Sequence, residues 1–505
     1  MKNKILHPDN LKKILNKKFK NKKVVLCHGV FDLLHFGHIK HFEEAKSYGD
    51  ILIVSITPDI FVNKGPSRPM FKENIRLRSL AALEIVDYVT INDGVSAINI
   101  IKKLKPNIYC KGPDYKDHKR DVTKNIKKEK EAIKSCKGKI VYTSGETFSS
   151  GSIINKYSDV LDTDTKKNIS KVKNLLNAKN IENIFKKISK LKILVIGELI
   201  IDEYTFSDAL GKSGKDPMLV LKEIKSEKYL GGAGSIARNL TPFSKNINLI
   251  TMLGEKSENK DFIKKELNKA QMFYIKKKNS PTIVKKRFLD IYSNSKVLGL
   301  YQFNDDKLNK KNEKDLQKII SKKITNYDLV IVSDYGHGFI SENTAKLISK
   351  KAKFVALNAQ INAANIGMHS LNKYQKIDCI IINEKELRYE FRDKNSEIKL
   401  LMKRLSKLRK AKKLIVTQGK SGSILYDQTK NKFTNIQAFA VSALDKIGAG
   451  DTMLTLSSLC FKVGLNNFLS LLIGSIGAAE SVKNFGNKEI IKKTQIIKTL
   501  ENISK

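Results

Sequence analysis

Short apolar runs alternate with longer amphipathic stretches along most of the chain. Short runs bounded by polar residues are typical of buried strands, and apolar residues at every third or fourth position are typical of helices. The alternation of the two predicts an α/β protein with parallel sheets covered on both faces. Strands are expected at residues 24–27, 51–56, 88–91, 108–110, 140–143, 193–197, 329–332, 354–357, 379–382 and 414–417.

Two of these strands lead into glycine-rich turns, and they lie far apart, at residues 24–27 and 193–197. The chain between the two parts is polar and carries apolar residues at helical spacing from Val172 to Ile188. We therefore expect two α/β domains, over residues 1–157 and 189–505, joined by a helical connector over residues 158–188.

Composition narrows the class of protein. The 505 residues carry a net charge of +44, but the lysines are spread over nearly every segment, which indicates a solvated surface rather than one basic face for nucleic acid. Five cysteines without a C-x-x-C pair argue against a disulfide scaffold and a structural zinc site, and favour a reducing compartment. Without an apolar segment of membrane length or a secretory signal, the sequence predicts a cytoplasmic protein.

The segment from Cys27 to His38 reads CHGVFDLLHFGH, and a helix is expected at residues 39–47. Residues three apart at a helix start face the same side, so His35 and His38 can meet one phosphate. The free amides of the helix add to the attraction of an anion.

Residues 24–155 resemble the cytidylyltransferase-like nucleotidyltransferases, and most of all the transferase half of the bifunctional bacterial heptose kinase/adenylyltransferases. Besides the H-x-G-H element, the resemblance rests on K-G at Lys64, on the R-x-x-x-L-x-x-L helix at Arg76, on K-G-P-D-Y at Lys111 and on S-S-G-S-I-I at Ser149. It implies a Rossmann-like domain that transfers a nucleotidyl group to a phosphate and releases pyrophosphate. The implied catalytic residues are His35, His38 and Lys64, and the implied nucleotide-binding residues are Gly29, Phe31, Asp32, Lys111, Asp114, Ser149, Ser150 and Ser152.

A second motif, Gly448-Ala449-Gly450-Asp451, precedes a long apolar helix expected at residues 453–463. Two glycines at a helix start let backbone amides surround an anion. The carboxylate of Asp451 can take a proton from an incoming hydroxyl while those amides stabilise the transferred phosphoryl group.

Residues 192–495 resemble the ribokinase-like (PfkB) carbohydrate kinases, which implies an α/β domain with a small β lid. The resemblance rests on the G-A-G-D motif and on I-G-E with Asp202, G-G-A-G at Gly231, S-D-Y-G-H-G at Ser333, N-x-x-E at Asn383 and T-Q-G-K-S-G at Thr417. It implies that Asp451 is the base. Sugar contacts are implied for Asp202, Gly231, Gly232 and Ser235, and ATP or phosphate contacts for Asn383, Glu386, Thr417, Gly419, Gly448, Ala449 and Gly450.

The chain departs from the kinase pattern at positions that face the sugar or the phosphates. Ser235 replaces the usual asparagine, Lys446 replaces a threonine, and an amide-rich segment at residues 358–365 replaces D-P-K/R-G. The order of the domains, transferase before kinase, is also the reverse of that in the heptose enzymes.

Together the two resemblances predict a bifunctional enzyme that makes a nucleotide-activated sugar, for lipopolysaccharide or another surface glycan. One half would phosphorylate a sugar or sugar phosphate, of heptose type, with ATP, and the other would use ATP or CTP. Mg²⁺ is expected to arrive with the triphosphates rather than in an all-protein cage, and the family implies a homodimer formed through the lid, at residues 204–230 and 282–303.

Three other readings stay open at this stage. The protein could be a CTP-dependent cytidylyltransferase of polyol or sugar phosphates with a regulatory kinase-like domain, a nucleic-acid-associated protein, or a non-catalytic ligand sensor. The sequence decides neither the nucleotide base nor the sugar and its phosphorylated hydroxyl. It also leaves the activity of the kinase half, the oligomeric state and any transfer of intermediate between the sites undecided.

Overall fold

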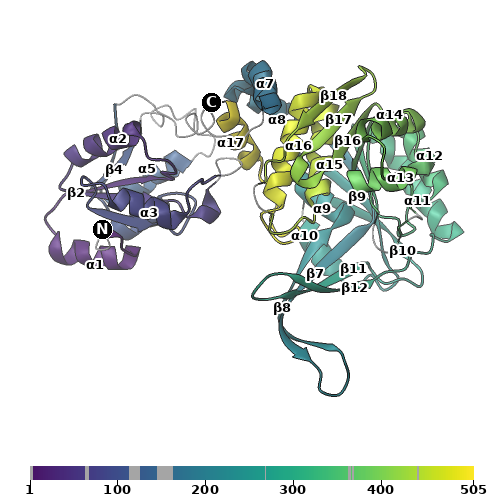
Figure 1. The fold of residues 1–505 in the computed structure, drawn as a ribbon, viewed down its shortest axis with the longest axis horizontal. Helices are drawn as coiled ribbons and strands as arrows, with labels where there is room; N and C mark the ends of the chain where they lie inside the picture. Colours follow the sequence, from purple (N-terminus) through teal and green to yellow (C-terminus); the bar gives the residue numbers. More distant parts are fainter. Residues whose placement is uncertain are drawn as a thin grey trace. The chain divides into compact units, whose positions relative to one another are not determined.

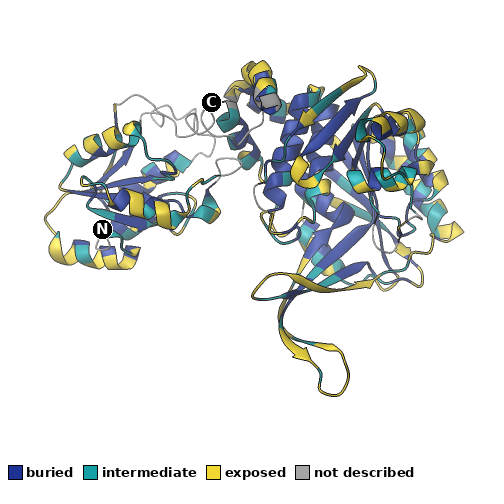
Figure 2. Cartoon of the chain, in the orientation of Figure 1, coloured by how far each residue is buried: buried dark blue, intermediate teal, exposed yellow. Residues whose placement is uncertain are grey.

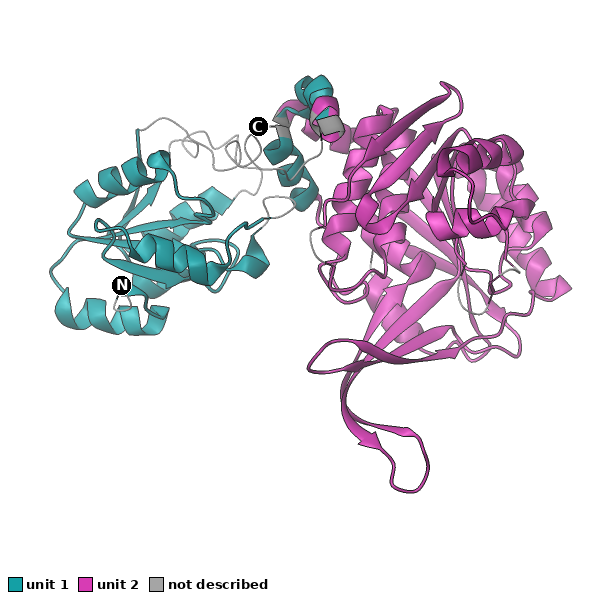
Figure 3. Ribbon diagram, in the orientation of Figure 1, with its two compact units in different colours: residues 1–162, 169–178, 494–505 teal, residues 163–168, 179–493 magenta. Residues whose placement is uncertain are grey.

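A computed structural model describes residues 4–62, 68–112, 125–144, 163–267, 269–361, 365–366, 369–440 and 443–504. The chain divides into two compact units (Figure 3). Residues 1–162, 169–178 and 494–505 belong to the first unit, and residues 163–168 and 179–493 belong to the second. In the described part of the chain, every helix is too short or too polar to cross a membrane.

The described residues of the first unit form a five-stranded parallel sheet (Figure 1). The order of its strands is β3-β2-β1-β4-β5. Its strands are β1 (Val24–Gly29), β2 (Ile51–Ile56), β3 (Tyr88–Ile91), β4 (Ile108–Lys111) and β5 (Lys139–Tyr142), and its helices are α1 (Pro8–Lys18), α2 (Phe36–Ser47), α3 (Glu73–Ala81), α4 (Ile98–Leu104) and α5 (Asn125–Ser135). The five strands lie where the apolar runs predict them.

Both faces of this sheet are covered, which is why its strands are continuously apolar. Phe42 of α2 and Leu80 of α3 pack on one face, together with Val25 and Cys27. The helices α1, α4 and α5 cover the other face. Because β1 pairs with both β2 and β4, the chain changes direction across the sheet at β1, and ligands of such sheets bind beyond the strand ends at that point.

Three helical segments lie within the range predicted for the connector. They are α7 (Thr163–Val172), a 3₁₀ turn (Lys173–Leu176) and α8 (Ala178–Ile188), and the last helix of the chain is α17 (Lys493–Ser504).

The described residues of the second unit form a nine-stranded sheet in the order β10-β9-β6-β13-β14-β15-β16-β17-β18. Its strands are β6 (Lys192–Gly197), β9 (Asn246–Gly254), β10 (Gln271–Lys277), β13 (Leu329–Asp334), β14 (Val355–Ala359), β15 (Cys379–Asn383), β16 (Lys413–Thr417), β17 (Ser423–Asp427) and β18 (Lys432–Ile436). The strands run parallel up to β16, and β17 and β18 add an antiparallel edge.

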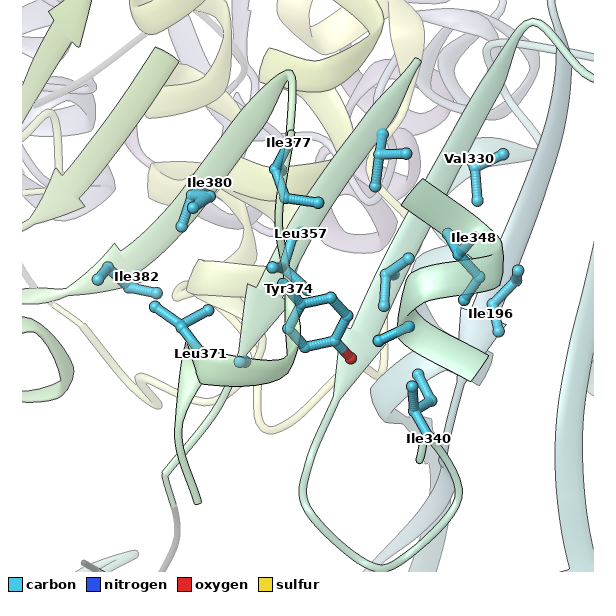
Figure 4. Packing of buried hydrophobic residues seen from close by; sticks show 14 of the residues in the cluster. Ile196, Val330, Ile340, Ile348, Leu357, Leu371, Tyr374, Ile377, Ile380 and Ile382 are labelled. Atoms are coloured by element: carbon cyan, nitrogen blue, oxygen red, sulfur yellow. The ribbon is translucent and has the colours of Figure 1, made fainter. Parts of the chain in front are cut away.

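Eight helices of the described residues accompany this sheet. They are α9 (Gly232–Leu240), α10 (Lys260–Leu267), α11 (Lys310–Lys323), α12 (Glu342–Lys351), α13 (Glu384–Phe391), α14 (Ile398–Arg409), α15 (Ala449–Lys462) and α16 (Asn467–Ser481). The largest apolar cluster lies between the sheet and α11, α12, α13 and α14, where Leu357, Ile380 and Ile382 of the sheet surround Tyr374 (Figure 4). The phenol of Tyr374 donates to Asp334 at 2.6 Å, so its one polar atom is satisfied inside the core.

A second sheet of this unit, in the order β12-β11-β7-β8, corresponds to the lid expected from the resemblance. Its strands are β7 (Leu199–Lys212), β8 (Leu219–Gly231), β11 (Val284–Asp290) and β12 (Lys296–Gln302). The far end of the β7–β8 hairpin and all of β12 are exposed, whereas the near end of the hairpin is buried (Figure 2).

Candidate active sites

The first candidate site begins where β1 turns into α2. The helix starts at Phe36, three residues earlier than the sequence pattern predicts, and His35 is its N-cap residue. His38 therefore lies in the first helical turn, and its ring stacks on that of His35 with a centroid distance of 3.9 Å and an interplanar angle of 27°. Phe31 contacts the ring of His38 edge-on at 5.3 Å. The two imidazoles thus lie together, as their spacing predicts.

Such a pair can bind a phosphate. The first amides of α2 lack partners within the helix and carry the positive end of its dipole. Two adjacent imidazoles at the same end supply further N–H donors, so the turn suits an anion that gains charge during a reaction.

Arg76 of α3 fastens the loops around this turn. It is 1% exposed. Its guanidinium donates to Val30 O at 2.6 Å, Thr57 O at 3.0 Å and Phe71 O at 3.0 Å, and it pairs with Asp59 at 2.5 Å. One planar group with five donors can satisfy this many acceptors, which a lysine cannot. The residue thus holds the ends of β1 and β2 and the start of α3 together.

Three of the expected nucleotide-binding residues build the turn itself. Both carboxylate oxygens of Asp32 accept backbone amides, from Met70 at 2.8 Å and Phe71 at 2.9 Å. Phe31 is buried with a φ of 49°, and a Cβ on Gly29 would lie 3.0 Å from its ring. These residues shape the loop next to the two histidines.

Lys111, the expected neighbour of the base or ribose, lies at the end of β4. It is 8% exposed, and its ammonium is 3.5 Å from Glu129 of α5. Five other residues expected at this site fall outside the described residues: Lys64, Asp114, Ser149, Ser150 and Ser152.

The second candidate site lies at the start of α15 in the second unit. Gly448 is the N-cap with a φ of 85°, a conformation that favours glycine. Gly450 has open space where a Cβ would project, so the first amides of the helix, with Ala449 between the glycines, can be approached closely. Asp451 follows in the first turn of the helix.

The carboxyl group of Asp451 has a defined partner that the sequence analysis did not assign to the site. Tyr335, just after β13, donates its hydroxyl to the two oxygens of Asp451 at 2.9 and 3.1 Å. Burial raises the pKa of Asp451 to about 7, and the Tyr335 hydrogen bond opposes this shift. A carboxyl group with a pKa near neutrality suits a general base at physiological pH.

Asp202 of β7 forms an ion pair with a basic residue of β11. The guanidinium of Arg287 in β11 lies 2.6 Å from Asp202 Oδ1, and the carboxylate is 4% exposed. A Cβ on Gly231 would lie only 2.3 Å from Asp202 Oδ2, so a glycine is required at that position. Asp202 also raises the pKa of Asp451, which places the two carboxyl groups in one electrostatic environment.

Lys285, in register with Asp202, is the most notable cation of this site. It is 7% exposed, and its ammonium lies 5.5 Å from the ring centroid of Tyr335 and 5.7 Å from that of Tyr301. Among the described residues, no oxygen accepts a hydrogen bond or forms an ion pair with it. Burial lowers its pKa, and Asp202 opposes this effect. The sequence carried a signal for these cations, because Lys285 and Arg287 are two apart and share one face of a strand.

Glu198 organises the turn that carries Tyr335. Its side chain is fully buried after β6 and accepts the amides of Tyr335 at 2.9 Å and His337 at 3.1 Å. Burial and, to a lesser extent, the negative charge of nearby Asp334 raise the pKa of Glu198 to about 7. The site thus lies at the carboxyl ends of β6 and β13, where the strand order of the sheet reverses.

The residues expected near ATP lie at the ends of β15 and β16. Asn383 and Glu386 form a capping box at the start of α13, with hydrogen bonds of 2.9 and 2.8 Å. Thr417 is in register with Asn383, and Gly419 has a φ of 57° with open space at its Cβ position. Burial raises the pKa of Glu386 to about 7, and Asp451 adds to this shift. Two carboxylates that affect one another are the hard oxygen donors that fit Mg²⁺ accompanying a triphosphate.

Two of the three departures from the kinase pattern have local explanations. Ser235 is buried in α9, and its hydroxyl oxygen is 3.5 Å from the amide nitrogen of Asn239, one turn further along the helix. In the amide-rich segment, Asn358 donates to Ile381 O at 2.7 Å and Asn365 donates to Tyr335 O at 2.8 Å. These amides support the backbone, and residues 362–364 lie outside the described residues.

Two known protein families match two separate parts of the chain. The model of the pfkB family carbohydrate kinases matches residues 190–456, and the cytidylyltransferase-like model matches residues 26–157.

Curated relatives are similar to this chain over part of its length. A protein named bifunctional protein HldE from Campylobacter jejuni subsp. doylei is 28% identical over 320 residues, which cover 60% of this chain and 66% of that protein. Proteins of the same name from Aliarcobacter butzleri and Geobacter metallireducens are 43% and 44% identical over 120 and 115 residues, or 23% and 22% of this chain and 25% and 24% of theirs. The matches thus span less than two thirds of each of these relatives.

Solved structures are similar in fold. Phosphofructokinase-2 from Escherichia coli in complex with potassium aligns over 62% of this chain and all of its own, with a TM-score of 0.52 and 14% identity. A mutant of the same enzyme aligns over the same shares with a TM-score of 0.51 and 13% identity.

Proposed function

The chain belongs to the pfkB family of carbohydrate kinases, and from that premise we propose that it is a bifunctional enzyme that makes a nucleotide-activated sugar. The observation that carries the proposal is the presence, in each compact unit, of a helix start that offers reactive side chains to an anion. The cytidylyltransferase-like match and the relatives named bifunctional protein HldE support the pairing of two activities.

In the proposed kinase reaction, Asp451 accepts the proton of a sugar hydroxyl as its oxygen attacks the γ-phosphorus of ATP, and ADP leaves. Gly448, Ala449 and Gly450 offer the amides of α15 to the transferred phosphoryl group. Asp202 orients the sugar through its hydroxyls. Ser235, whose oxygen accepts from Asn239, can donate its own proton to the sugar. Glu386 would help to hold the Mg²⁺ that accompanies ATP, and the ion would supply charge neutralisation of the phosphates.

We propose that the sugar is itself phosphorylated, in keeping with a heptose-type substrate. A neutral sugar needs no ammonium, yet Lys285 places one beside Asp202 and Tyr335 without an ion-pair partner among the described residues. A buried charge without a partner is costly, so a phosphate group that pairs with it would gain binding energy.

In the proposed transferase reaction, a phosphate oxygen of the substrate attacks the α-phosphorus of ATP or CTP, and pyrophosphate leaves. The nucleophile is already an anion, so positioning and charge neutralisation carry the catalysis. His35 and His38 would stabilise the crowded phosphorus, with Lys64 as a further cation. Lys111 is proposed to border the base or ribose. Asp114 and the loop of Ser149, Ser150 and Ser152 are proposed to contact the nucleotide.

The alternative of a cytidylyltransferase with an inactive kinase-like domain has less support. The second unit retains the proposed base, its hydrogen-bonding tyrosine and the open helix start.

The experiment that tests the proposal measures two products of the purified full chain. ADP formation is followed with ATP, Mg²⁺ and a panel of sugars and sugar phosphates. Pyrophosphate release is followed with ATP and CTP separately against sugar 1-phosphates and polyol phosphates. We expect ADP with a heptose 7-phosphate and pyrophosphate with a heptose 1-phosphate. Saturable ATP binding with neither product would contradict the proposal.

We also propose that the chain forms a homodimer through the lid. The strand β12 is exposed along its length, and Val297, Leu298, Leu300 and Tyr301 are 39–56% exposed. A row of exposed apolar residues on an edge strand is a ready surface for a second copy. Sedimentation equilibrium should give a dimer for the natural chain and a monomer for a variant with both Leu298→Glu and Leu300→Glu. A monomeric natural chain would contradict the proposal.

A further inference from the structure

A group of sulfur and nitrogen atoms in the first unit has no part in the proposed transferase reaction. It consists of Cys27, His41 and Cys110, and one potential ligand atom from each residue lies within 4.8 Å of the other two. Both cysteines are fully buried, and His41 is partly exposed. Of the described histidines, cysteines and acidic residues, only these three are close enough together to form such a group.

The fold brings these residues together although they are far apart in the sequence. Cys27 of β1 and Cys110 of β4 are register partners on adjacent parallel strands, so both side chains leave the sheet on the same face. The helix α2 packs on that face through Phe42. His41 lies three residues after His38 on this helix, so it points in a similar direction. The absence of a C-x-x-C pair argued against a zinc site, but the register of the sheet supplies the pair that the spacing lacks.

One ring nitrogen of His41 contacts the hydroxyl group of a threonine. Its Nδ1 lies 3.1 Å from Thr143 Oγ1. The Thr143 hydroxyl can donate to Lys111 O at 3.4 Å, which leaves its oxygen able to accept from the imidazole. With the ring proton on Nδ1, the lone pair on Nε2 is available to a metal. Metal-binding histidines are commonly held in this way by a hydrogen bond from the other nitrogen.

We propose that Cys27, His41 and Cys110 form a site for a thiophilic divalent ion, Zn²⁺, with one open coordination position. Two thiolates and one imidazole match the donor preference of zinc, and three protein ligands leave a fourth position for water. The ion connects α2 to the centre of the sheet and so fixes the helix that carries His35 and His38.

The charge of the bound ion and the protons that it displaces both balance. Free cysteines are mostly protonated thiols at neutral pH. One Zn²⁺ displaces two thiol protons, which leave to solvent, and the two thiolates cancel its charge. A neutral imidazole binds the ion without losing a proton. The buried site thus acquires no net charge.

The experiment uses the full chain purified without chelator and measures its zinc content by mass spectrometry. We expect about one zinc per chain, and loss of at least nine tenths of it in Cys27→Ser and in Cys110→Ser. Cys136→Ser is the matched control, because Cys136 belongs to the same unit but not to the group, and it should keep its zinc. Replacement by Co²⁺ should give a thiolate-to-cobalt charge-transfer band in the natural chain and in Cys136→Ser only.

Several results would overturn the proposal. One is a natural chain that binds neither zinc nor cobalt, and another is equal zinc in the natural chain and both serine variants. A Cys27–Cys110 disulfide in metal-free protein that zinc cannot prevent would assign the cysteines to a redox pair instead. If the serine variants fail to fold, His41→Gln, at a partly exposed position, provides the same comparison. Unchanged zinc affinity in that variant would also overturn the proposal.

Discussion

Burial and one neighbouring side chain shift the pKa of the Asp451 carboxyl group in opposite directions. Burial raises its pKa to about 7, and the hydroxyl of Tyr335 lowers it by donating to the charged form. The pKa of the proposed base is thus set by one hydrogen bond and by its burial, and both can be altered one residue at a time.

The kinase reaction should therefore lose rate in acid. A base must be deprotonated to act, so kcat/KM for the sugar substrate should fall about tenfold per pH unit below pH 7. Tyr335→Phe removes the hydrogen bond that lowers the pKa of Asp451, and the acid limb of the profile should move to higher pH.

The control for this prediction is Glu386→Gln. The pKa of Glu386 is also about 7, so it could give a similar limb. If the limb disappears in Glu386→Gln and is unmoved in Tyr335→Phe, then Asp451 is not the group that titrates.

Lys285 should matter for a phosphorylated sugar only. Lys285→Met should raise KM for the sugar phosphate about 10- to 100-fold, since a hydrogen bond to a charged group contributes about 1.5–3 kcal/mol. KM for the corresponding unphosphorylated sugar should change little. Lys286→Met is the matched control, because Lys286 lies on the other face of β11 and pairs with Glu203 at 3.0 Å. Equal effects on both sugars would mean that the ammonium does not bind the phosphate.

At the scale of elements, the start of α2 depends on contacts that hold neighbouring loops. Arg76 joins the carbonyl groups of Val30, Thr57 and Phe71 and the carboxylate of Asp59. Removing one member of such a buried network leaves the others without partners, which costs more than the network contributes when intact.

Arg76→Met should lower the free energy of unfolding of the first unit by about 3 kcal/mol. The second unit should be unaffected. Hydrogen exchange of peptides from β1 and β13 during urea unfolding of the full chain measures the two units separately. Arg78→Met, at an exposed position on the same helix, serves as the control and should change neither. A loss of stability in both units, or in neither, would contradict this assignment.

The sequence predicts the regular parts of these elements well and their ends less well. Buried parallel strands are continuously apolar, so β1 and β13 are visible as short runs. The start of α2 is not visible in the sequence, because His35 caps the helix through its backbone conformation and makes no side-chain cap. The partly exposed edge strand β18 and the exposed lid strand β12 also lack the apolar pattern that marks a buried strand.

The same reasoning explains which site residues the sequence indicates. Asp451 and the two histidines lie in short motifs whose spacing carries the chemistry. Lys285 enters the site from a strand that is distant in sequence, and its relation to Asp202 depends on the register between β11 and β7. A sequence pattern contains no such register, so contacts of this kind appear only in the fold.

At the scale of the whole molecule, the central claim is that one chain carries two catalytic sites in two compact units. A reciprocal measurement tests it most directly: ADP formation and pyrophosphate release by the natural chain, His38→Asn and Asp451→Asn. His38→Asn should lose at least about 100-fold in pyrophosphate release, the scale expected for one transition-state hydrogen bond, and keep its ADP formation. Asp451→Asn should show the opposite pattern. If both activities fall together in either variant while the protein stays folded, the two-site account is wrong.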